Sequence, residues 1–470
     1  MQPFIGKDFL LKSETAKTLF HQYAADMPIF DYHNHLEAEE IYNKKQYENL
    51  TQLWLTGDHY KWRVMRMMGI DEKYITGDAA DYDKFMKWAY TVRRLPGSPL
   101  YHWVHLELQR YFDISLPLNE NTAKEIWNLT VERLKAGDIN ARSLLESQKV
   151  KALCTTNDPY EDLQWHKKLR EDSSNTIKVL PCFRPDKLLH VEQPIWKGSI
   201  AKMEERYKVK IDTWESFCNA LSLSLDFFAE EGCLMSDHGF IHFNLKRGEN
   251  AAEIFTKALN DTQLSKDEIA IFKGELMYFL GKAYHKRSFA MQMHLGALRN
   301  TNSGMFKKIG PDTGFDSVGA ATSPKTLASY LNRLARKDNL PPTIFYCLNP
   351  NDSLMMATMA PNFASADDMP AKIQVGTPWW HSDTLRGIQN QLTDIMETGQ
   401  LFGSTGMLTD SRSFTSFCRH EYYRRILCNM LGELVEEGGY ENDIAFLGEI
   451  VQNICYNNAV RYFHLNTENA

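Results

Sequence analysis

Eight short apolar runs alternate with longer segments of helical periodicity along most of this 470-residue chain, and this alternation constrains the fold more than any other feature. A nearly continuous apolar run is typical of a parallel strand buried on both faces, and a longer helical segment between two such runs can serve as a crossover. The pattern therefore predicts an α/β fold, namely a distorted (β/α)8 barrel of the TIM type. The runs are residues 27–36, 150–156, 177–183, 233–238, 289–294, 343–348, 372–376 and 403–410.

A doubly wound open sheet would fit the same alternation. Its nucleotide-binding versions carry a glycine-rich motif directly after a strand, either G-x-G-x-x-G or G-x-x-x-x-G-K-[ST]. Neither motif follows any of the runs, which favours the barrel. The expected crossover helices include residues 212–231, 324–337, 383–398 and 420–437.

Residues 36–147 break the alternation, because their apolar residues recur at three- and four-residue spacing throughout. We interpret this stretch as a helical insertion that follows the first strand, with residues 1–35 and 148–470 forming the barrel. The methionines and aromatic residues of the insertion are expected in its core, since Met fills irregular gaps between helices.

The composition is that of an ordinary globular protein, with 43% hydrophobic and 24% charged residues. The net charge of −7 is spread along the chain without a basic block, so a nucleic-acid partner is not expected. An acidic balance still permits an anionic substrate, because a few arginines can dominate the field inside a cleft.

The eight cysteines are scattered and include no C-x-x-C motif, which indicates reduced thiols and a cytoplasmic location. No apolar window approaches the length of a membrane span, and the first residues lack the pattern of a secretion signal. We therefore expect a cytoplasmic protein with no membrane partner.

Two histidines one residue apart, His33 and His35, end the first apolar run. Side chains at positions i and i+2 of a strand point to the same face, so the two imidazoles aim at one point. They are half of a transition-metal site, although two unrelated histidines on a loop would give the same pattern.

The remaining ligands are expected at the ends of other strands, because the carboxyl ends of barrel strands meet at one mouth. His294 ends the fifth run and Asp410 the eighth, which gives three imidazoles and one carboxylate with a position left for water or substrate. His238, at the end of the fourth run, competes with His294 for the third position. A structural histidine paired with Asp237 is the equal alternative for His238.

Two arginines and two tryptophans also follow strands. Arg184 and Arg412 offer planar forks that match a carboxylate with two hydrogen bonds. Trp379 and Trp380 could wall a pocket for a sugar-like ligand or cap the barrel.

These residues stand within motifs that resemble the uronate isomerase family, also called glucuronate isomerases, an outlying branch of the amidohydrolase superfamily. The resemblance extends over essentially the whole chain. Its most specific parts are FDYHNHL at residues 30–36, LTGDHYKWR at 55–63, LPCFRPD at 180–186, QMHLGALRN at 292–300, GPDTGFDS at 310–317 and MLTDSRSF at 407–414.

The resemblance implies the distorted barrel and the interconversion of D-glucuronate with D-fructuronate and of D-galacturonate with D-tagaturonate. It implies His33, His35 and Asp410 as metal ligands, with His294 on or beside the metal. It adds His59 and Tyr60 of the insertion, which join Arg184, Arg412 and the two tryptophans around the substrate. Asp410 is expected as the base and Tyr60 as the group that moves the hydroxyl proton, although the two could exchange roles.

The binuclear hydrolases of the superfamily use a modified lysine after the fourth strand, where this chain has Asp237 and His238. We therefore expect one divalent metal ion. Zinc is the expected ion, although manganese, cobalt, nickel or iron would suit the same ligands. A metal-dependent hydrolase of the same superfamily is the alternative function. The expected partners are a small uronate and further copies of the chain in a homo-oligomer.

Overall fold

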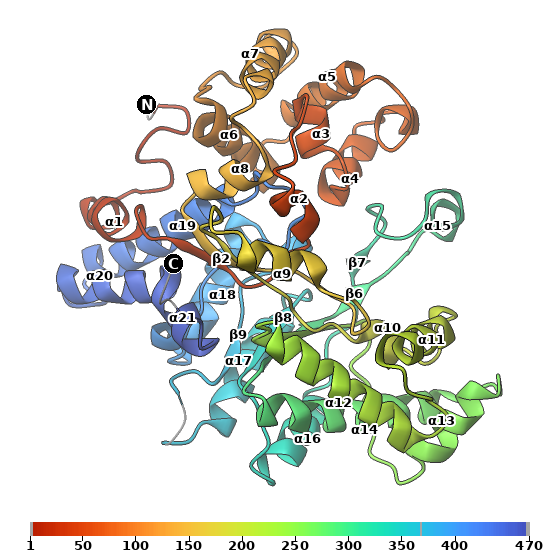
Figure 1. The fold of residues 1–470 in the computed structure, drawn as a ribbon. Helices are drawn as coiled ribbons and strands as arrows, with labels where there is room; N and C mark the ends of the chain where they lie inside the picture. Colours follow the sequence, from red (N-terminus) through yellow and green to blue (C-terminus); the bar gives the residue numbers. More distant parts are fainter. Residues whose placement is uncertain (1–2, 367–368, 467–470) are drawn as a thin grey trace.

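The computed structural model describes residues 3–366 and 369–466, which form an α/β protein with two main parallel sheets (Figure 1). The first sheet has the order β1-β2-β3 and the second the order β4-β5-β8-β9. The strands are β1 (Ile29–Asp31), β2 (Val150–Cys154), β3 (Lys178–Leu180), β4 (Met235–Phe240), β5 (Ala290–Leu295), β8 (Thr343–Cys347) and β9 (Ile373–Val375). Each of them lies within or overlaps one of the first seven apolar runs, so those seven predictions are confirmed.

A single parallel bridge between Phe183 and Ser236 joins the two sheets, just beyond the end of β3. Strand β5 is buried along its whole length, as expected for a parallel strand covered on both faces. Within the described ranges, the sheets do not close into a complete barrel, because no ladder joins β9 to β1.

The eighth run was expected to be a strand, and this prediction is wrong: residues 404–411 form neither helix nor strand and pair in no ladder. Side chains replace the ladder partners. The backbone N–H of Thr405 donates to the Gln374 side chain, and that of Thr409 donates to Asp31. Positive φ angles at Gly406 and Asp410 interrupt the regular strand geometry. The segment still lies against the end of β1, because the Asp410 N–H donates to the His33 carbonyl.

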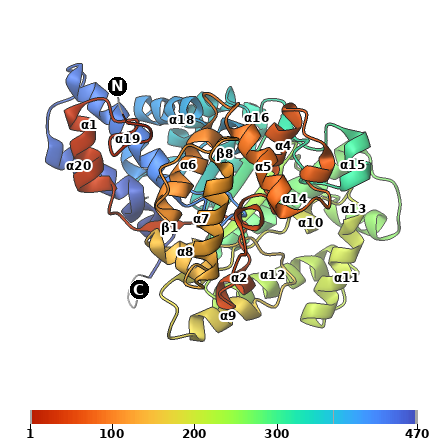
Figure 2. The ribbon, with the colours of Figure 1, turned by 90° about the horizontal axis from the view of Figure 1, so that it is seen from above.

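The chain between β1 and β2 is helical. The helices of this stretch gather on one side in Figure 1 and lie in front of the strands when seen from above in Figure 2, so they cover one end of the sheets. They are α2 (Ala38–Tyr42), α3 (Leu50–Trp54), α4 (His59–Met67), η2 (Glu72–Tyr74), α5 (Asp81–Val92), α6 (Pro99–Phe112), α7 (Ala123–Lys135) and α8 (Ala141–Ser147).

Further helices pack around the outside of the sheets, and the four crossover helices expected from the sequence are α12, α16, α18 and α19. The helices beyond β2 are α9 (Gln164–Glu171), α10 (Asp186–Leu189), α11 (Ile195–Tyr207), α12 (Trp214–Glu230), α13 (Ala251–Leu259), α14 (Lys266–Lys286), α15 (Ser303–Ile309), α16 (Pro324–Ala335), α17 (Asp352–Met359), η3 (Ala360–Phe363), η4 (Trp380–Ser382), α18 (Leu385–Glu397), η5 (Leu401–Gly403), α19 (Cys418–Glu436), α20 (Ile444–Gln452), η6 (Asn453–Asn457) and α21 (Asn458–Tyr462).

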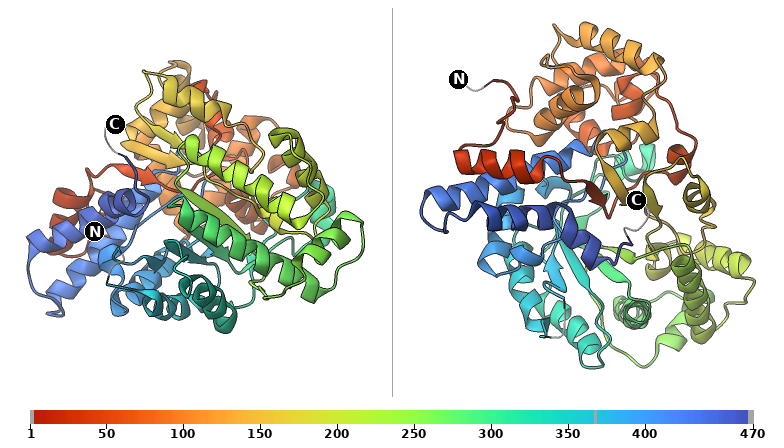
Figure 3. Two further views of the ribbon diagram at one scale, coloured as in Figure 1. Left: turned by 60° about the horizontal axis from the view of Figure 1, so that its bottom comes forward. Right: turned by 60° about the vertical axis from the view of Figure 1, so that its left-hand side comes forward.

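The two ends of the chain pack together. Helix α1 (Glu14–Thr18) contacts α19, and η1 (Leu19–Ala24) contacts α20, so red and blue segments lie side by side in Figure 3. Helix α14 begins at a capping box in which Ser265 and Glu268 satisfy each other's backbone N–H groups. Among the helices of the described ranges, none is both long and apolar enough to cross a bilayer. All eight cysteines are free thiols.

A short segment outside the two main sheets, residues 297–318, contributes to the site and is called the β6–β7 excursion below. Strands β6 (Ala297–Leu298) and β7 (Ser317–Val318) pair antiparallel and carry α15 between them. Arg63 of α4 donates to the carbonyl of Asp316, and Arg66 of the same helix is hydrogen-bonded to the carbonyl of Thr313. The excursion is thus fastened to the helices that follow β1.

Candidate active site

A cavity of about 380 Å³ lies between the strand ends, helix α4 and the β6–β7 excursion. It is lined by ten of the residues singled out from the sequence, so the fold brings together segments that are far apart along the chain. These residues are His33, His35, His59, Tyr60, Arg184, His294, Trp379, Trp380, Asp410 and Arg412. His238 does not line this cavity.

The first cluster at the cavity consists of His33, His35 and Asp410. Oδ1 of Asp410 lies 3.2 Å from Nε2 of His33 and 3.0 Å from Nε2 of His35. Two backbone hydrogen bonds align the segments, from the Asp410 N–H to the His33 carbonyl and from the His35 N–H to the Ser411 carbonyl. Asp31, at the end of β1, accepts from the Thr409 N–H and fixes the same junction.

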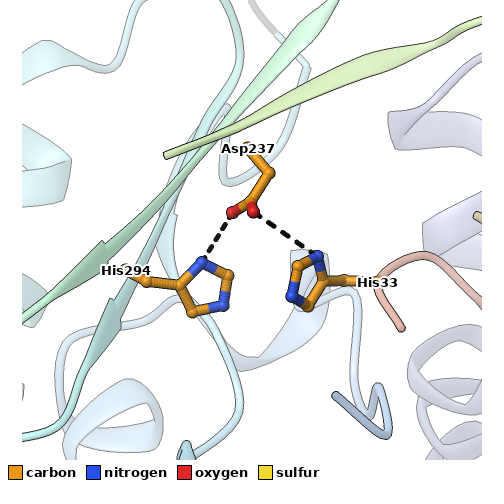
Figure 4. A group of neighbouring side chains, drawn as sticks. All are labelled: His33, Asp237 and His294. Atoms are coloured by element: carbon orange, nitrogen blue, oxygen red, sulfur yellow. Dashed lines mark hydrogen bonds and ion pairs between the residues drawn. The ribbon is translucent and has the colours of Figure 1, made fainter. Parts of the chain in front are cut away.

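The second cluster, drawn in Figure 4, consists of His33, Asp237 and His294. Nδ1 of His294 lies 2.7 Å from Oδ1 of Asp237, and Nδ1 of His33 lies 4.0 Å from Oδ2. The His33 and His294 rings are 4.6 Å apart between centroids. All three residues are buried, and His33 belongs to both clusters.

Asp237 is a residue that the sequence reasoning missed. Successive side chains of a strand point to opposite faces. Asp237 points toward His33 and His294 (Figure 4). Nε2 of His238 lies 3.1 Å from the Tyr284 hydroxyl, and His238 belongs to neither cluster. His238 is thus a buried, hydrogen-bonded histidine, as one alternative expected, but its partner is Tyr284, because Asp237 pairs with His294 and Arg184. The period of two along β4 was the available signal.

The Arg184 guanidinium forms ion pairs with two carboxylates. Its Nε donates to Oδ2 of Asp186 at 2.9 Å, and its Nη1 lies 3.0 Å from Oδ2 of Asp237. Arg412 is freer, with 39% of its side chain exposed and Asp312 of the β6–β7 excursion at 3.6 Å.

Helix α4 begins at the cavity, where the Asp58 side chain caps it by accepting from the N–H groups of Tyr60 and Lys61. This cap places His59 and Tyr60 at the first turn, stacked with 4.5 Å between ring centroids. The Tyr60 hydroxyl is buried and has no hydrogen-bond partner in the part of the chain that the structure describes. Burial, together with the charge of Asp410, raises the pKa of Tyr60 well above its usual range.

Both tryptophans wall the cavity. Trp379 packs edge-on against the His294 ring at 4.9 Å, and Trp380 packs against the His59 ring at 5.4 Å. The Arg299 guanidinium lies 4.3 Å from the centroid of the Trp380 ring. Trp380 adopts a positive φ of 49°, a conformation held by its surroundings.

Further charged residues reach the cavity that the sequence reasoning did not select. Lys61 is buried and lies 2.9 Å from Asp58, and Arg419 pairs with the buried Asp383. Glu107 accepts from the Thr415 hydroxyl at 2.7 Å. The sequence did not indicate that these residues reach the cavity, because a charged residue on a helix is usually exposed to solvent.

Burial and neighbouring charges shift several pKa values at the site. Burial lowers the pKa of His35 to about 4, even though Asp410 opposes the shift. Burial alone would raise the pKa of Asp410, but hydrogen bonds from His33 and His35 hold it well below its usual range. The cluster therefore holds an ionised Asp410 carboxylate beside His35, whose lowered pKa favours the neutral imidazole. Burial lowers the pKa of His33, but the charges of Asp237 and Asp410 outweigh it and raise that pKa, so a metal ion would displace a proton from His33.

The first cluster fits a divalent transition metal. Its ligand atoms lie within 4.8 Å of one another, and imidazole with carboxylate is a donor set that suits zinc. Oδ2 of Asp410 is buried without a hydrogen-bond partner among the described residues, so it is available as a donor. The residues present thus match the implied ion.

The chain matches known proteins over its whole length. A family model described as glucuronate isomerase matches residues 1–463. The uronate isomerase of Caldanaerobacter subterraneus subsp. tengcongensis is 47% identical over 464 residues, which cover 98% of this chain and 99% of the relative. The uronate isomerase of Bacillus subtilis is 46% identical over 472 residues and is covered completely, as is this chain.

Solved structures agree with the sequence matches. The crystal structure of uronate isomerase from Thermotoga maritima superposes with a TM-score of 0.92 at 34% identity, covering 98% of this chain and 100% of the other. That of glucuronate isomerase from Caulobacter crescentus gives a TM-score of 0.90 at 22% identity, covering 99% and 98%, and is evidence for the fold alone.

Proposed function

The chain belongs to the glucuronate isomerase family, whose members are also named uronate isomerases, and from this premise we propose its reaction and its catalytic residues. The chain is an enzyme that isomerises uronates between aldose and ketose forms. We propose that it interconverts D-glucuronate with D-fructuronate and D-galacturonate with D-tagaturonate through a cis-enediol intermediate.

The observation that carries the proposal is the convergence of His33, His35 and Asp410 on one wall of the cavity. These three residues would hold one divalent ion, for which we propose zinc, with His294 beside it. The ion, when bound, would act as a Lewis acid toward the oxygens of the substrate.

Asp410 is the proposed base. Its carboxylate would take the proton from C2 of the open-chain aldose, exchange it with solvent and deliver a proton to C1, which converts the C1 aldehyde into the C2 ketone through the enediol. The buried, protonated Tyr60 hydroxyl would assist the matching transfer of the hydroxyl proton from O2 to O1. His59, which stacks on Tyr60, would donate a hydrogen bond to the oxygen on which charge develops.

The substrate carboxylate is proposed to bind Arg412. The Arg184 guanidinium already contacts Asp186 and Asp237, so its charge is largely compensated. Arg412 meets Asp312 at the longer distance of 3.6 Å and is partly exposed at the cavity, which leaves its fork available for a carboxylate. Arg184, Trp379 and Trp380 are proposed to line the rest of the substrate pocket.

The wider architecture follows the same proposal. We interpret the two sheets and the irregular residues 404–411 as a distorted (β/α)8 barrel built from residues 1–35 and 148–470, with residues 36–147 as a helical insertion. The free cysteines suit a cytoplasmic enzyme, and symmetric self-association into a homo-oligomer is proposed on general grounds.

Incubation with D-glucuronate in heavy water tests the reaction. The expected result is formation of the ketose with deuterium at C1, detected by NMR, together with exchange at C2 of the recovered aldose. Absence of both product and exchange from the metal-loaded enzyme, combined with turnover of amides or lactones, would replace the isomerase by a metal-dependent hydrolase. The same experiment with D-galacturonate tests the second substrate pair.

A further inference from the structure

His33 is shared by two groups of metal-ligating side chains, and it presents a different ring nitrogen to each. Nε2 lies 3.2 Å from Asp410 in the first group, whereas Nδ1 lies 4.0 Å from Asp237 in the second. A neutral imidazole has one nitrogen lone pair, so it can bind an ion on one side only. The two groups are therefore alternatives for a single ion.

The second group already contains a cation. Nη1 of Arg184 lies 3.0 Å from Oδ2 of Asp237, the same oxygen that faces His33. Asp237 is completely buried, and its other oxygen accepts from His294. A divalent ion at this group would have to displace the guanidinium or lie beside it, and like charges in a buried site repel strongly.

The Arg184 guanidinium is held by a hydrogen bond to Asp186 and by a close fit against Gly239. Its Nε donates to Oδ2 of Asp186, and the same oxygen accepts from the Gly239 N–H at 3.0 Å. A Cβ atom at position 239 would lie 3.0 Å from Nη2 of Arg184 and 3.2 Å from Oδ2 of Asp186. The absence of a side chain at Gly239 thus makes room for the guanidinium.

We infer that Arg184 decides which group holds the ion: its guanidinium occupies the cation position of the His33–Asp237–His294 group, and the ion is thereby confined to His33, His35 and Asp410. The inference rests on the proposed metal site. The inference explains why Asp237, a buried aspartate next to two histidines, does not bind the ion. The guanidinium also keeps the ion on the side of the cavity, which is lined by His35 and Asp410 but not by Asp237.

The test is metal rescue. Purified variants are dialysed against zinc-free buffer, loaded with zinc chloride and measured by elemental analysis, with circular dichroism as the check of folding. Asp410→Asn is expected to lose its zinc, because a neutral amide replaces the charged carboxylate ligand. Adding Arg184→Met is expected to restore about one zinc per chain, because Asp237 becomes free to bind together with His33 and His294.

Two control variants test whether removal of the positive charge beside Asp237 causes the restored zinc binding. Asp410→Asn combined with Arg184→Lys keeps a cation at the group and is expected to stay free of zinc. Adding Asp237→Asn to the rescued variant is expected to abolish the restored binding. If Asp410→Asn with Arg184→Met fails to fold, Asp410→Asn with Arg184→Gln, which also removes the positive charge but keeps a polar side chain, takes its place.

The outcomes are distinct. A folded Asp410→Asn, Arg184→Met variant that stays without zinc overturns the inference and leaves the proposed function intact. Restored zinc that survives Asp237→Asn also overturns it. Zinc retained by the single Asp410→Asn variant overturns the proposed metal site, and the inference with it.

Discussion

Nε2 of His33 lies 3.2 Å from Oδ1 of Asp410, although His33 follows the first strand and Asp410 belongs to the last quarter of the chain. The contact is fixed by the backbone, because the Asp410 N–H donates to the carbonyl of His33 itself at 3.1 Å. The proposed metal ligands, the proposed base and the junction between the first strand and residues 404–411 thus form one structural unit.

Removing a metal ligand should remove both the ion and the activity. His33→Ala and Asp410→Asn are each expected to lower metal affinity by about tenfold or more and to abolish most turnover. Elemental analysis after dialysis and a coupled assay of ketose formation measure the two effects. His238→Gln is the matched control, since it changes a histidine that is equally buried but belongs to neither cluster, and it should retain the ion. Unchanged metal content in both ligand variants would show that the ligands are misplaced.

Tyr60 and Arg412 should differ in the kinetic constant that they affect. Tyr60→Phe removes the hydroxyl that is proposed to move a proton, so kcat is expected to fall by about a hundredfold with little change in KM. Arg412→Met removes a carboxylate clamp, so KM should rise by about tenfold or more. Steady-state kinetics with D-glucuronate separates the two, and Arg412→Lys should recover part of the affinity. Small and equal effects from both variants would contradict the assigned roles.

The buried pair of Arg419 and Asp383 should matter for stability. Arg419→Met leaves the Asp383 carboxylate buried without its partner, which is expected to cost about 3–5 kcal/mol in the free energy of unfolding. Adding Asp383→Asn removes that charge and should recover much of the loss. Urea unfolding followed by circular dichroism gives both values. Arg170→Met, at the half-exposed contact with Glu231, is the control and should cost less than about 1 kcal/mol. An Arg419→Met variant as stable as this control would contradict the prediction.

Buried histidines should make the fold sensitive to acid. Burial lowers the pKa of His105 to about 4, because its ring lies in the interior and its Nε2 accepts from the Leu118 N–H. Between the unfolded value of about 6.5 and the folded value, the unfolded chain binds the proton and the folded chain does not. The contribution of His105 is therefore complete above pH 6.5 and is lost as the pH falls toward 4, by about 1.4 kcal/mol per pH unit.

Urea unfolding at several pH values between 7 and 4.5 measures this slope. His105→Gln, which keeps an acceptor for the Leu118 N–H and does not titrate, should show a shallower loss of stability on acidification. An identical slope in the variant would contradict the pKa shift at His105.

Local patterns predicted much of the fold. The runs that contain or overlap β2, β5 and β8 were found because a strand buried on both faces needs consecutive apolar residues. Helix α16 was found from its apolar periodicity, since one face must pack on the sheets. The eighth strand was predicted wrongly, because side chains of Gln374 and Asp31 take the hydrogen bonds that a ladder would have made.

The site was predicted in part. The i, i+2 spacing of His33 and His35 and the polar ends of several runs identified residues that line one cavity. Asp237 was missed, because it was considered only as the partner of His238, and the strand's alternation that turns Asp237 toward His33 was not applied. The sequence could not show that Arg184 contacts a buried carboxylate whereas Arg412 is partly exposed, since two arginines that follow strands look alike until their carboxylate partners are known.

The sequence by itself determined the alternation of strands and helices, the family and the chemical types of the site residues, because these depend on neighbouring residues or on motifs read along the chain. Only the tertiary structure decided that Asp410 meets His33, that Asp237 faces His294 and that Arg184 is occupied by two carboxylates. Contacts of this kind depend on how distant segments pack, and packing fixes distances that the order of residues does not contain.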